Sequence, residues 1–350
     1  MSDIDSSGKS IGRIYAISTV GSIIGTFLGG FVLISFFKTR TIFLGVAIIL
    51  LCLSRIYGKR SLFFVIFSIC CMLFFGVANN DRFVESVYNV MQIIDAEEQD
   101  RPVRYLVTGN GSLQSGMYLD KPNELLFDYT KYYLLGLDFF PEAESVVVIG
   151  GGAYSVPKKF LELKKKVTVV EIDPKLTEIA QKFFSLPDDE NLTIINEDAR
   201  VFMNKTKNTY DIVCLDVFTE SIVPFHVATV EAAERLKALS HSAVIINVIS
   251  AIEGNDGRLA QGIIKAFSQV FPEIQVYLVK ENNPSEIQNI IIIASKKKLS
   301  DTPVNDILYT KLAPTRYKGS LALPIEPLQD DYAPVELFTS AFPQRDFARR

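Results

Sequence analysis

Two long runs without a charged residue restrict the fold of this chain more than any other feature of its sequence. Residues 14–37 and 61–80 contain 24 and 20 uncharged residues, and each is long enough to cross a bilayer core of roughly 30 Å. Between them lie 14 uncharged residues, 41–54, which span a membrane only if Arg40 and Arg55 extend to opposite interfaces. We therefore predict a transmembrane block over residues 1–82. Its three predicted helices cover 14–37, 41–57 and 61–79.

The predicted helices have the composition of an anchor. Neither long run contains Asp, Glu, Lys or Arg, so neither offers the ionisable relay that ion-coupled transporters need. Gly21, Gly25 and Gly29 recur every four residues, a spacing that lets another helix approach closely. Two interpretations stay open, namely contact with a partner helix or a second copy of the chain, and packing among the three predicted helices.

Charge is distributed unevenly along the chain. Residues 1–80 hold seven basic and two acidic residues, a net charge of +5, whereas the remaining 270 hold 29 and 38, a net charge of −9. A basic apolar block followed by an acidic globular block predicts a membrane anchor joined to an enzyme-sized domain. An acidic domain repels phosphates, so we expect no nucleic-acid partner.

Cysteine and histidine are too few to support a disulfide framework or a metal site. Cys214 is the one cysteine outside the apolar N-terminal stretches, so the globular part has no second thiol with which to pair. His226 and His241 have no Cys or His partner at the spacing of metal ligands. We therefore expect no zinc or other metal.

The sequence pattern of the globular part changes once along its length. Residues 83–140 alternate short β-favouring runs with turn residues, which predicts a small antiparallel β-hairpin domain. Residues 141–350 alternate apolar strand runs with helical segments, which predicts an α/β, methyltransferase-like (Rossmann-type), doubly wound sheet of seven strands. The last two runs are joined by a polar loop without a helix, so we expect an antiparallel hairpin at the edge of the sheet. The seven runs are VVVI, VTVVEI, LTII, DIVCLD, AVIINVI, QVYLV and NIIIIA.

Glycines and acids follow three successive strands of the predicted sheet. A glycine triplet after the first strand lets a ligand approach the backbone and the next helix. An acid at the end of the second strand can accept both hydroxyls of a ribose, and the residues after the third strand suit an adenine edge. An adenosine-containing ligand is therefore predicted; the alternative is a glycine turn that only tightens packing. Ser155 replaces the third glycine of G-x-G-x-x-G, which disfavours NAD. The predicted nucleoside-site residues are Gly150, Gly151, Gly152, Glu171, Asp198 and Ala199.

A further acid, Asp216, ends the fourth strand run, DIVCLD. The carboxyl ends of central strands face the crevice in which open α/β sheets bind ligands. Glu220 lies four residues further on. We predict that Asp216 takes part in the chemistry, and the alternative is that it caps a helix N-terminus.

These segments carry a family resemblance. VVVIGGG, VTVVEIDP, NEDARVF and YDIVCLDVF together resemble the polyamine aminopropyltransferase (spermidine synthase) family. PFHVAT, NVISAIEG and DDYAPVE (residues 330–336) are similar to a bacterial branch in which this domain is fused to transporter-like spans, and the first apolar run resembles the last of those spans. The resemblance covers nearly the whole chain.

The resemblance implies transfer of an aminopropyl group from decarboxylated S-adenosylmethionine, a co-substrate, to a putrescine-like amine, without a prosthetic group. The products would be a spermidine-type amine and methylthioadenosine. Asp216 matches the family's proton acceptor, Glu171 its ribose ligand, Asp198 with Ala199 its adenine-side pair, and Asn89 a nucleoside-contacting glutamine. The residues that the resemblance assigns to the amine pocket are Gln114, Asp128, Tyr132, Tyr133, Glu220 and Pro224. Tyr129 and His226 are further candidates without an assigned role.

Two departures from the family pattern affect the acceptor. Ala153 stands where the family has an aspartate that holds the amine ends of the ligands, and Tyr133 stands where it has a histidine. Losing a carboxylate removes an ionic contact to a cationic polyamine, which disfavours putrescine as the acceptor. The acids of DDYAPVE have two interpretations, as part of the acceptor pocket or as a cap on the fold.

Three functions therefore compete. The leading hypothesis is a membrane-anchored aminopropyltransferase, and S-adenosylmethionine-dependent methyl transfer and a non-catalytic nucleoside- or polyamine-sensing module of a membrane partner are the alternatives. The basic residues that flank the predicted helices favour a globular domain outside the cytoplasm, five against three. The donor substrates of all three functions are made in the cytoplasm and Cys214 is unpaired, so we predict a multi-pass inner-membrane protein with a cytoplasmic catalytic domain. We expect it to contact lipid and to form a homodimer or to bind a helical membrane partner.

Overall fold

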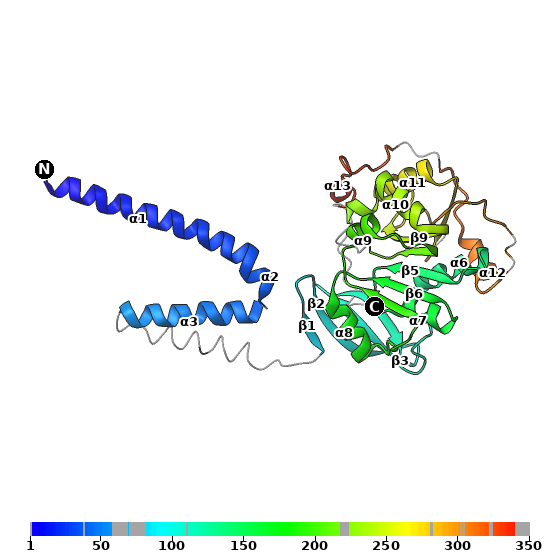
Figure 1. Cartoon of the computed structure of the whole chain (residues 1–350), viewed down its shortest axis with the longest axis horizontal. Helices are drawn as coiled ribbons and strands as arrows, with labels where there is room; N and C mark the ends of the chain where they lie inside the picture. The colour runs from blue at the N-terminus through cyan, green and yellow to red at the C-terminus, as the bar shows by residue number, and fades with distance from the viewer. Residues whose placement is uncertain are drawn as a thin grey trace. The chain divides into compact units, whose positions relative to one another are not determined.

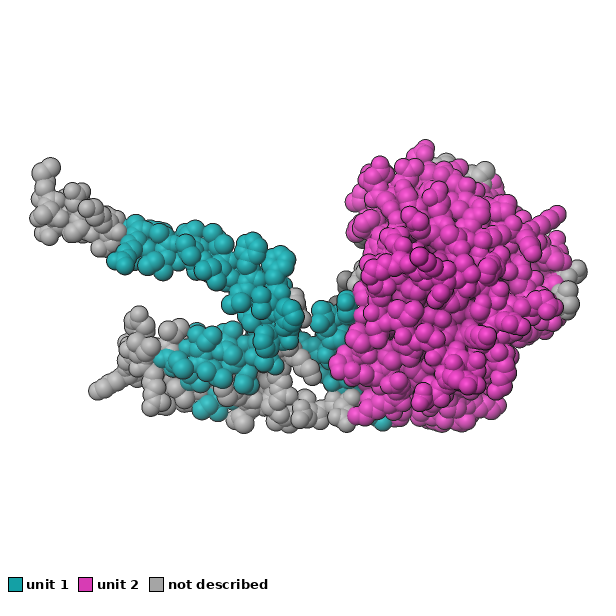
Figure 2. Space-filling view, in the orientation of Figure 1, with its two compact units in different colours: residues 1–91 teal, residues 92–350 magenta. Residues whose placement is uncertain are grey.

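The computed structural model divides the chain into two compact units, residues 1–91 and 92–350, which are coloured separately in Figure 2. The predicted divisions at 82/83 and 140/141 stay predictions. The residues described are 2–37, 39–57, 69, 82–109, 111–217, 224–280, 283–301, 303, 305–321 and 325–339.

The first unit begins with a long apolar helix. Helix α1 (Ser2–Phe27) continues through a π-helical turn, η1 (Leu28–Leu33), and a short α2 (Ile34–Phe36). The backbone becomes extended at Phe37, with φ −124° and ψ 141°, which ends the helix. In the described residues, Ile11–Leu33 is the one segment long and apolar enough to cross a membrane.

The second predicted span corresponds to α3 (Thr39–Tyr57), but its apolar part, Thr41–Cys52, is shorter than a typical span. The third predicted span, 61–79, lies outside the described residues apart from Ile69. One candidate helix is therefore found where three were predicted, and the multi-pass arrangement stays a prediction.

A four-stranded sheet follows the apolar segments, as predicted. Its strands lie in the order β1-β2-β3-β4, and the boundary between the two units falls inside β2. Gln99 and Asp100, between β2 and β3, both have positive φ, 51° and 61°, the conformation of the two-residue turns that suit antiparallel hairpins. The strands are β1 (Phe83–Glu85), β2 (Val90–Glu98), β3 (Arg101–Thr108) and β4 (Ser112–Tyr118).

A seven-stranded sheet forms the centre of the second unit and confirms the predicted fold class. Its order is β10-β11-β9-β8-β5-β6-β7; β9, β8, β5, β6 and β7 are parallel neighbours, and β11 and β10 form the predicted antiparallel hairpin at one edge. The strands are β5 (Ser145–Ile149), β6 (Lys166–Val170), β7 (Leu192–Ile195), β8 (Tyr210–Leu215), β9 (Ser240–Ser250), β10 (Glu273–Leu278) and β11 (Gln288–Ser295).

Helices cover both faces of this sheet (Figure 1). One face packs against α9 (Ala199–Lys205), α10 (Val230–Leu239) and α11 (Arg258–Val270). The other packs against α7 (Ser155–Glu162), α8 (Pro174–Phe183), α12 (Tyr309–Leu312) and the segment that joins the two sheets, formed by α5 (Asp128–Lys131), η2 (Tyr132–Leu134) and α6 (Leu135–Phe139). The remaining short elements are η3 (Phe225–Val227), η4 (Asn255–Gly257), η5 (Ala313–Thr315) and α13 (Val335–Thr339).

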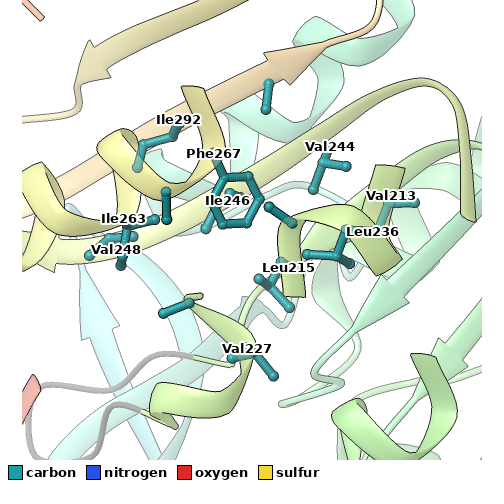
Figure 3. Packing of buried hydrophobic residues seen from close by; sticks show 14 of the residues in the cluster. Val213, Leu215, Val227, Leu236, Val244, Ile246, Val248, Ile263, Phe267 and Ile292 are labelled. Carbon is teal, nitrogen blue, oxygen red and sulfur yellow. The ribbon is translucent and has the colours of Figure 1, made fainter. Parts of the chain in front are cut away.

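Alternate residues of the strands fill two apolar cores. Figure 3 shows the core beneath α10 and α11, where Phe267 of α11 lies against Ile246 of β9 and Leu236 of α10 lies near Leu215 of β8. Strands β8 and β9 are buried on both faces, which explains their nearly continuous apolar runs. The parallel strands bring the carboxyl ends of β8, β5, β6 and β7 together, and these ends carry the predicted site residues.

Candidate active site

The glycine turn after β5 touches the backbone of Asp216. Gly150 has φ +97°, and a Cβ on it would lie 2.2 Å from the carbonyl oxygen of Asp216. The Asp216 N–H donates to the carbonyl of Ile149, the residue before the turn, at 2.8 Å. Close packing against the Asp216 backbone therefore requires a glycine at position 150, and ligand binding by the triplet stays a prediction. The same packing brings the turn and Asp216 together.

The turn closes onto α7 through a strained residue. Tyr154 has φ +59°, a left-handed conformation that side chains with a Cβ rarely adopt. Its N–H donates to the Gly151 carbonyl at 2.8 Å, and its buried hydroxyl lies 2.7 Å from the Thr177 hydroxyl. These contacts hold the turn in place before α7 begins at Ser155.

Glu171 is a buried carboxylate that links the turn to the end of β6. Its Oε2 accepts the Gly151 N–H at 2.7 Å and its Oε1 accepts the Asp173 N–H at 2.9 Å. Burial raises its pKa, and these backbone donors partly oppose the rise. Each oxygen has a further lone pair, so ribose binding stays a prediction that these bonds permit.

Asp198 caps α9 and faces His226. Its Oδ1 accepts the N–H groups of Arg200 and Val201 at 2.9 and 3.0 Å, the usual role of an N-cap. Its Oδ2 lies 3.5 Å from Nε2 of His226. Ala199, the first residue of α9, packs against the core beneath α10. Both carboxylate oxygens of the half-buried Asp198 therefore contact the protein, and adenine binding stays a prediction.

Asp216 lies in the most unusual electrostatic environment of the site. Its Oδ1 accepts the side-chain N–H of Asn247 at 3.0 Å, and its Oδ2 lies 3.4 Å from the Tyr129 hydroxyl. The Tyr133 hydroxyl donates to the carbonyl of the preceding Leu215 at 3.1 Å. Burial raises the pKa of Asp216 to about 6, and the hydrogen bond from Asn247, followed by the nearby tyrosine hydroxyls, limits the rise. The described contacts of the carboxylate are with side chains, and both its catalytic role and the capping alternative stay predictions.

The predicted amine-pocket residues divide into groups. Tyr133 contributes to the surroundings of Asp216, whereas the hydroxyl of Tyr132 lies 3.0 Å from Thr315 and contacts the Leu278 carbonyl. Asp128 pairs with Lys131 at 2.6 Å, and its side chain is 74% exposed. These two side chains are therefore engaged away from the Asp216 carboxylate.

Gln114 has a property that a ligand pocket would explain. Its Oε1 is buried without a hydrogen-bond partner among the described residues, and burying an unpaired carbonyl is costly. The neighbouring Ser115 side chain lies 3.6 Å from the position that a Cβ on Gly152 would take. Gln114 of β4 is therefore next in sequence to a residue that approaches the glycine turn, and it stays a predicted pocket residue.

The other predicted residues are not brought together in the described structure. Pro224 is half-buried and precedes η3, Glu220 lies outside the described residues, and Asn89 belongs to the first unit. Ala153, at the departure from the family pattern, is fully buried. Two open hollows, of about 510 and 620 Å³, lie elsewhere, and none of the predicted site residues lines them.

Sequence analysis missed Asn247 as a partner of Asp216 and left Tyr129 without a role. Asn247 interrupts the run AVIINVI, and a polar residue in a strand buried on both faces is the signal that could have found it. Tyr129 precedes Tyr133 by four residues, the spacing that places side chains on one face of a helix.

The segment DDYAPVE acts as a clamp in the structure. The Asp330 carboxylate pairs with Arg200 of α9 and accepts from the Thr229 hydroxyl at 2.6 Å, while its N–H donates to Glu231 of α10 at 3.0 Å. Arg200 in turn donates to the His226 carbonyl at 2.9 Å. These contacts favour the interpretation that this segment caps the fold.

In the described part of the chain, no group of three or more His, Cys, Asp or Glu residues is arranged to hold a metal. Cys214 is buried as a free thiol in β8.

Comparison with known proteins points to one family. Residues 133–305 match the family described as "Spermine/spermidine synthase domain". A polyamine aminopropyltransferase of Vibrio vulnificus is 28% identical over 241 residues, covering 66% of this chain and 78% of the relative. The large sheet and its helices are thus similar to the spermine/spermidine synthase family. The homologous enzymes are transferases, and the family uses decarboxylated S-adenosylmethionine as a co-substrate.

Two further relatives describe the breadth of the similarity. The crystal structure of a probable spermidine synthase from Corynebacterium glutamicum has a TM-score of 0.57 and 21% identity, covering 75% of this chain and 95% of that protein, which supports the fold. An N-terminal histidine N-methyltransferase of Emericella nidulans is 27% identical over 190 residues, 51% of this chain but 33% of the relative. The sheet fold is thus shared with a methyl-transferring relative.

Proposed function

We propose that this chain transfers an aminopropyl group from decarboxylated S-adenosylmethionine to an amine, with Asp216 as the general base. One observation carries the proposal. Asp216 is a partly buried carboxylate with a raised pKa that uncharged side chains contact, and its backbone lies against the glycine turn. A group of this kind at the carboxyl end of a central strand suits proton transfer.

The proposed reaction needs little beyond positioning and removal of a proton. The acceptor nitrogen attacks the aminopropyl carbon next to the sulfonium, the C–S bond breaks, and its electron pair stays on the sulfur of methylthioadenosine. The proton lost by the nitrogen passes to Asp216. A free amine has a pKa of roughly 10 and is protonated at neutral pH, so a base beside the attacking nitrogen increases the reactive fraction.

The raised pKa of Asp216 suits this role in two ways. A carboxyl with a pKa of about 6 is still largely ionised at pH 7 and accepts a proton more readily than an ordinary aspartate. Tyr129 and Tyr133 stay protonated, because burial and the Asp216 charge raise both hydroxyl pKa values well above their ordinary range. They therefore act as hydrogen-bond donors and not as competing bases.

The remaining predicted residues would bind the two substrates. Glu171 and Asp198 present carboxylate oxygens for the ribose and adenine, with the glycine turn beside them. The unpaired Oε1 of Gln114 would accept an N–H of the amine. Asn89 and Glu220 remain predicted nucleoside and amine contacts.

Incubation of the purified full-length chain with decarboxylated S-adenosylmethionine and a panel of amines, followed by mass spectrometry, tests the proposal. We expect methylthioadenosine and an amine heavier by one aminopropyl group, both lost in Asp216→Asn. The exposed Asp188→Asn, which changes no predicted site residue, is the matched control for loss of a carboxylate. Binding of the nucleoside without any product would instead favour the sensing module.

Methyl transfer is a second candidate function. Ala153 is buried and uncharged, so no carboxylate at this position repels the carboxyl group of intact S-adenosylmethionine. The similarity to an N-methyltransferase is in keeping with it. Formation of S-adenosylhomocysteine from S-adenosylmethionine, without methylthioadenosine from the decarboxylated donor, would establish methyl transfer and contradict the leading proposal.

The membrane anchor and the location belong to the proposal. The segment Ile11–Leu33 supports at least one span, and the multi-pass inner-membrane arrangement, the cytoplasmic catalytic domain and the homodimer or helical partner extend it. A phosphatase reporter fused after Arg350 is expected to be inactive because that enzyme needs the periplasm. Full activity of the reporter would contradict the cytoplasmic placement.

A further inference from the structure

Two asparagines interrupt an otherwise apolar face of the sheet beside Asp216. On this face β9 contributes Ala243 and Ile245, both fully buried, before Asn247, whose exposed fraction is 2%. Asn289 lies on β11, where it pairs with Ile249, while Asn247 pairs with Ile291. The two asparagines are therefore diagonal neighbours on one face, close enough for their side chains to meet.

The two amides form a directed chain of hydrogen bonds that ends on the carboxylate. The side-chain N–H of Asn289 donates to Oδ1 of Asn247 at 2.9 Å, and the Asn247 N–H donates to Oδ1 of Asp216 at 3.0 Å. Rotating the Asn247 amide by half a turn would present its oxygen to the carboxylate and its N–H groups to the Asn289 donor. Both contacts would then be repulsive, so Asn289 selects the orientation that points a donor at Asp216.

We propose that Asn289 is a positioning residue for the reaction, which acts through Asn247 to keep a hydrogen-bond donor directed at Asp216. The inference rests on the proposed function, in which Asp216 is the general base. Asn289 does not itself contact the carboxylate in the described structure. Its effect should therefore depend entirely on the presence of Asn247.

The other groups that face Asp216 leave Asn247 as its principal donor. Tyr129 comes from α5 and Tyr133 from η2, and the Cys214 thiol lies two residues earlier on β8. Burial raises the pKa of all three groups well above its ordinary value, so all are neutral where Asp216 titrates. The Asn247 contact, at 3.0 Å, is shorter than the 3.4 Å contact to Tyr129. Loss of the Asn247 donor should therefore raise the Asp216 pKa more than any other single change around it.

A double-mutant cycle on the full-length chain tests the inference. The variants are Asn289→Ala, Asn247→Ala and the double variant. The readout is the pKa of Asp216, followed by infrared spectroscopy as the carboxyl band that is missing in Asp216→Asn. A hydrogen bond to a charged group corresponds to about one pKa unit or more, so we expect Asn247→Ala to raise the pKa by about one unit and Asn289→Ala to raise it by a smaller amount. The double variant should match Asn247→Ala. Additive shifts, or no shift in Asn289→Ala, would overturn the inference.

A second substitution keeps the test informative if Asn247→Ala does not fold. In Asn289→Asp the new carboxylate would accept a hydrogen bond from the Asn247 N–H, so the Asn247 amide would rotate and present its oxygen to Asp216. The pKa of Asp216 should then rise further than in Asn289→Ala. An equal or smaller rise would count against the positioning role of Asn289. Asn208→Asp, in an exposed loop, is the matched control for the added charge and should leave the pKa unchanged.

The infrared measurement needs no turnover, so the two proposals fail separately. In an active enzyme, the acid limb of kcat should move upward with the spectroscopic pKa. If infrared spectroscopy shows the expected pKa shifts but the protein transfers no aminopropyl group, the proposed function alone would be rejected. If the enzyme transfers aminopropyl groups, but neither the acid limb of kcat nor the infrared pKa changes in Asn289→Ala, the positioning role of Asn289 alone would be rejected.

Discussion

Replacing Asp216 by asparagine should stabilise the fold at neutral pH while it abolishes transfer. Burial raises the pKa of Asp216 from 3.8 to about 6, a shift of about two units, or about 3 kcal/mol at 1.36 kcal/mol per unit. The side chain keeps some contact with solvent, so we expect about 1–2 kcal/mol. Asparagine has nearly the same shape and can still accept from Asn247. The gain therefore reports the cost of the buried charge.

The pH dependence fixes the sign of this effect. Because the folded-state pKa is the higher one, the folded protein binds more protons than the unfolded chain between about pH 4 and pH 6, and stability falls as pH rises through that window. The difference in unfolding free energy between Asp216→Asn and the parent should be absent near pH 4, increase toward pH 6 and stay constant above pH 6. Thermal unfolding of the detergent-solubilised chain from pH 4 to pH 8 measures it, with an expected gain of a few degrees at pH 7.

Asp211, at the start of the same strand, provides the matched control. Burial works against its ionisation, but hydrogen bonds from Ser145 and from the Glu144 N–H outweigh burial and lower its pKa. Its contribution to stability is therefore present at neutral pH and lost as pH falls through its lowered pKa. Asp211→Asn should destabilise the protein at pH 7. If Asp216→Asn also destabilises it at pH 7, or gives a gain that does not vary with pH, the reasoning about a costly buried charge is wrong.

Three further predictions follow from individual contacts. Gly150→Ala places a Cβ 2.2 Å from the Asp216 carbonyl oxygen at φ +97°, so we expect at least about 3 kcal/mol of destabilisation in urea unfolding; a loss below about 1 kcal/mol would show that the turn adapts. In Glu171→Gln the amide NH₂ group would face one of the two backbone N–H donors that the carboxylate now accepts. Calorimetry should then show weaker binding of methylthioadenosine and a loss of about 1–3 kcal/mol in stability. Unchanged binding would refute a role for Glu171 in holding the ribose. Asp330→Asn weakens the partly exposed pair with Arg200 and should cost about 1 kcal/mol or less without changing KM for the amine, whereas a raised KM at unchanged stability would place this acid in the acceptor pocket.

The order of elements could be predicted because it depends on local sequence. Each strand of the large sheet is an apolar run rich in β-branched residues and bounded by polar or glycine-containing segments, so both its type and its place in the chain are legible. The acids after β6, β7 and β8 were found for the same reason. In a parallel sheet, residues that follow neighbouring strands meet at one edge.

The contacts around Asp216 could not be predicted because they depend on register and on side-chain direction. Asn289 reaches Asn247 only through the antiparallel pairing of β11 with β9, and a shift of one residue would have placed it on the opposite face. Tyr132 and Tyr133 are adjacent and chemically identical, yet one hydroxyl lies against Thr315 and the other near Asp216. Sequence alone did not distinguish them. The clamp between Asp330 and Arg200 joins residues 130 positions apart, beyond the reach of any local pattern.

Polar residues stand around Asp216 at positions where apolar residues would be expected to pack. Asn247 and Asn289 stand where their strands otherwise carry isoleucine or alanine, and Gly150 stands where a side chain would collide with the Asp216 backbone. Apolar residues at the two asparagine positions would leave the carboxylate without its closest donor, which would raise its pKa toward about 7 and lower its ionised fraction at neutral pH. The proposed base must be ionised to accept a proton, so its function would depend on these two amides. Their presence in a run of isoleucines is better explained by the chemistry of Asp216 than by the stability of the sheet.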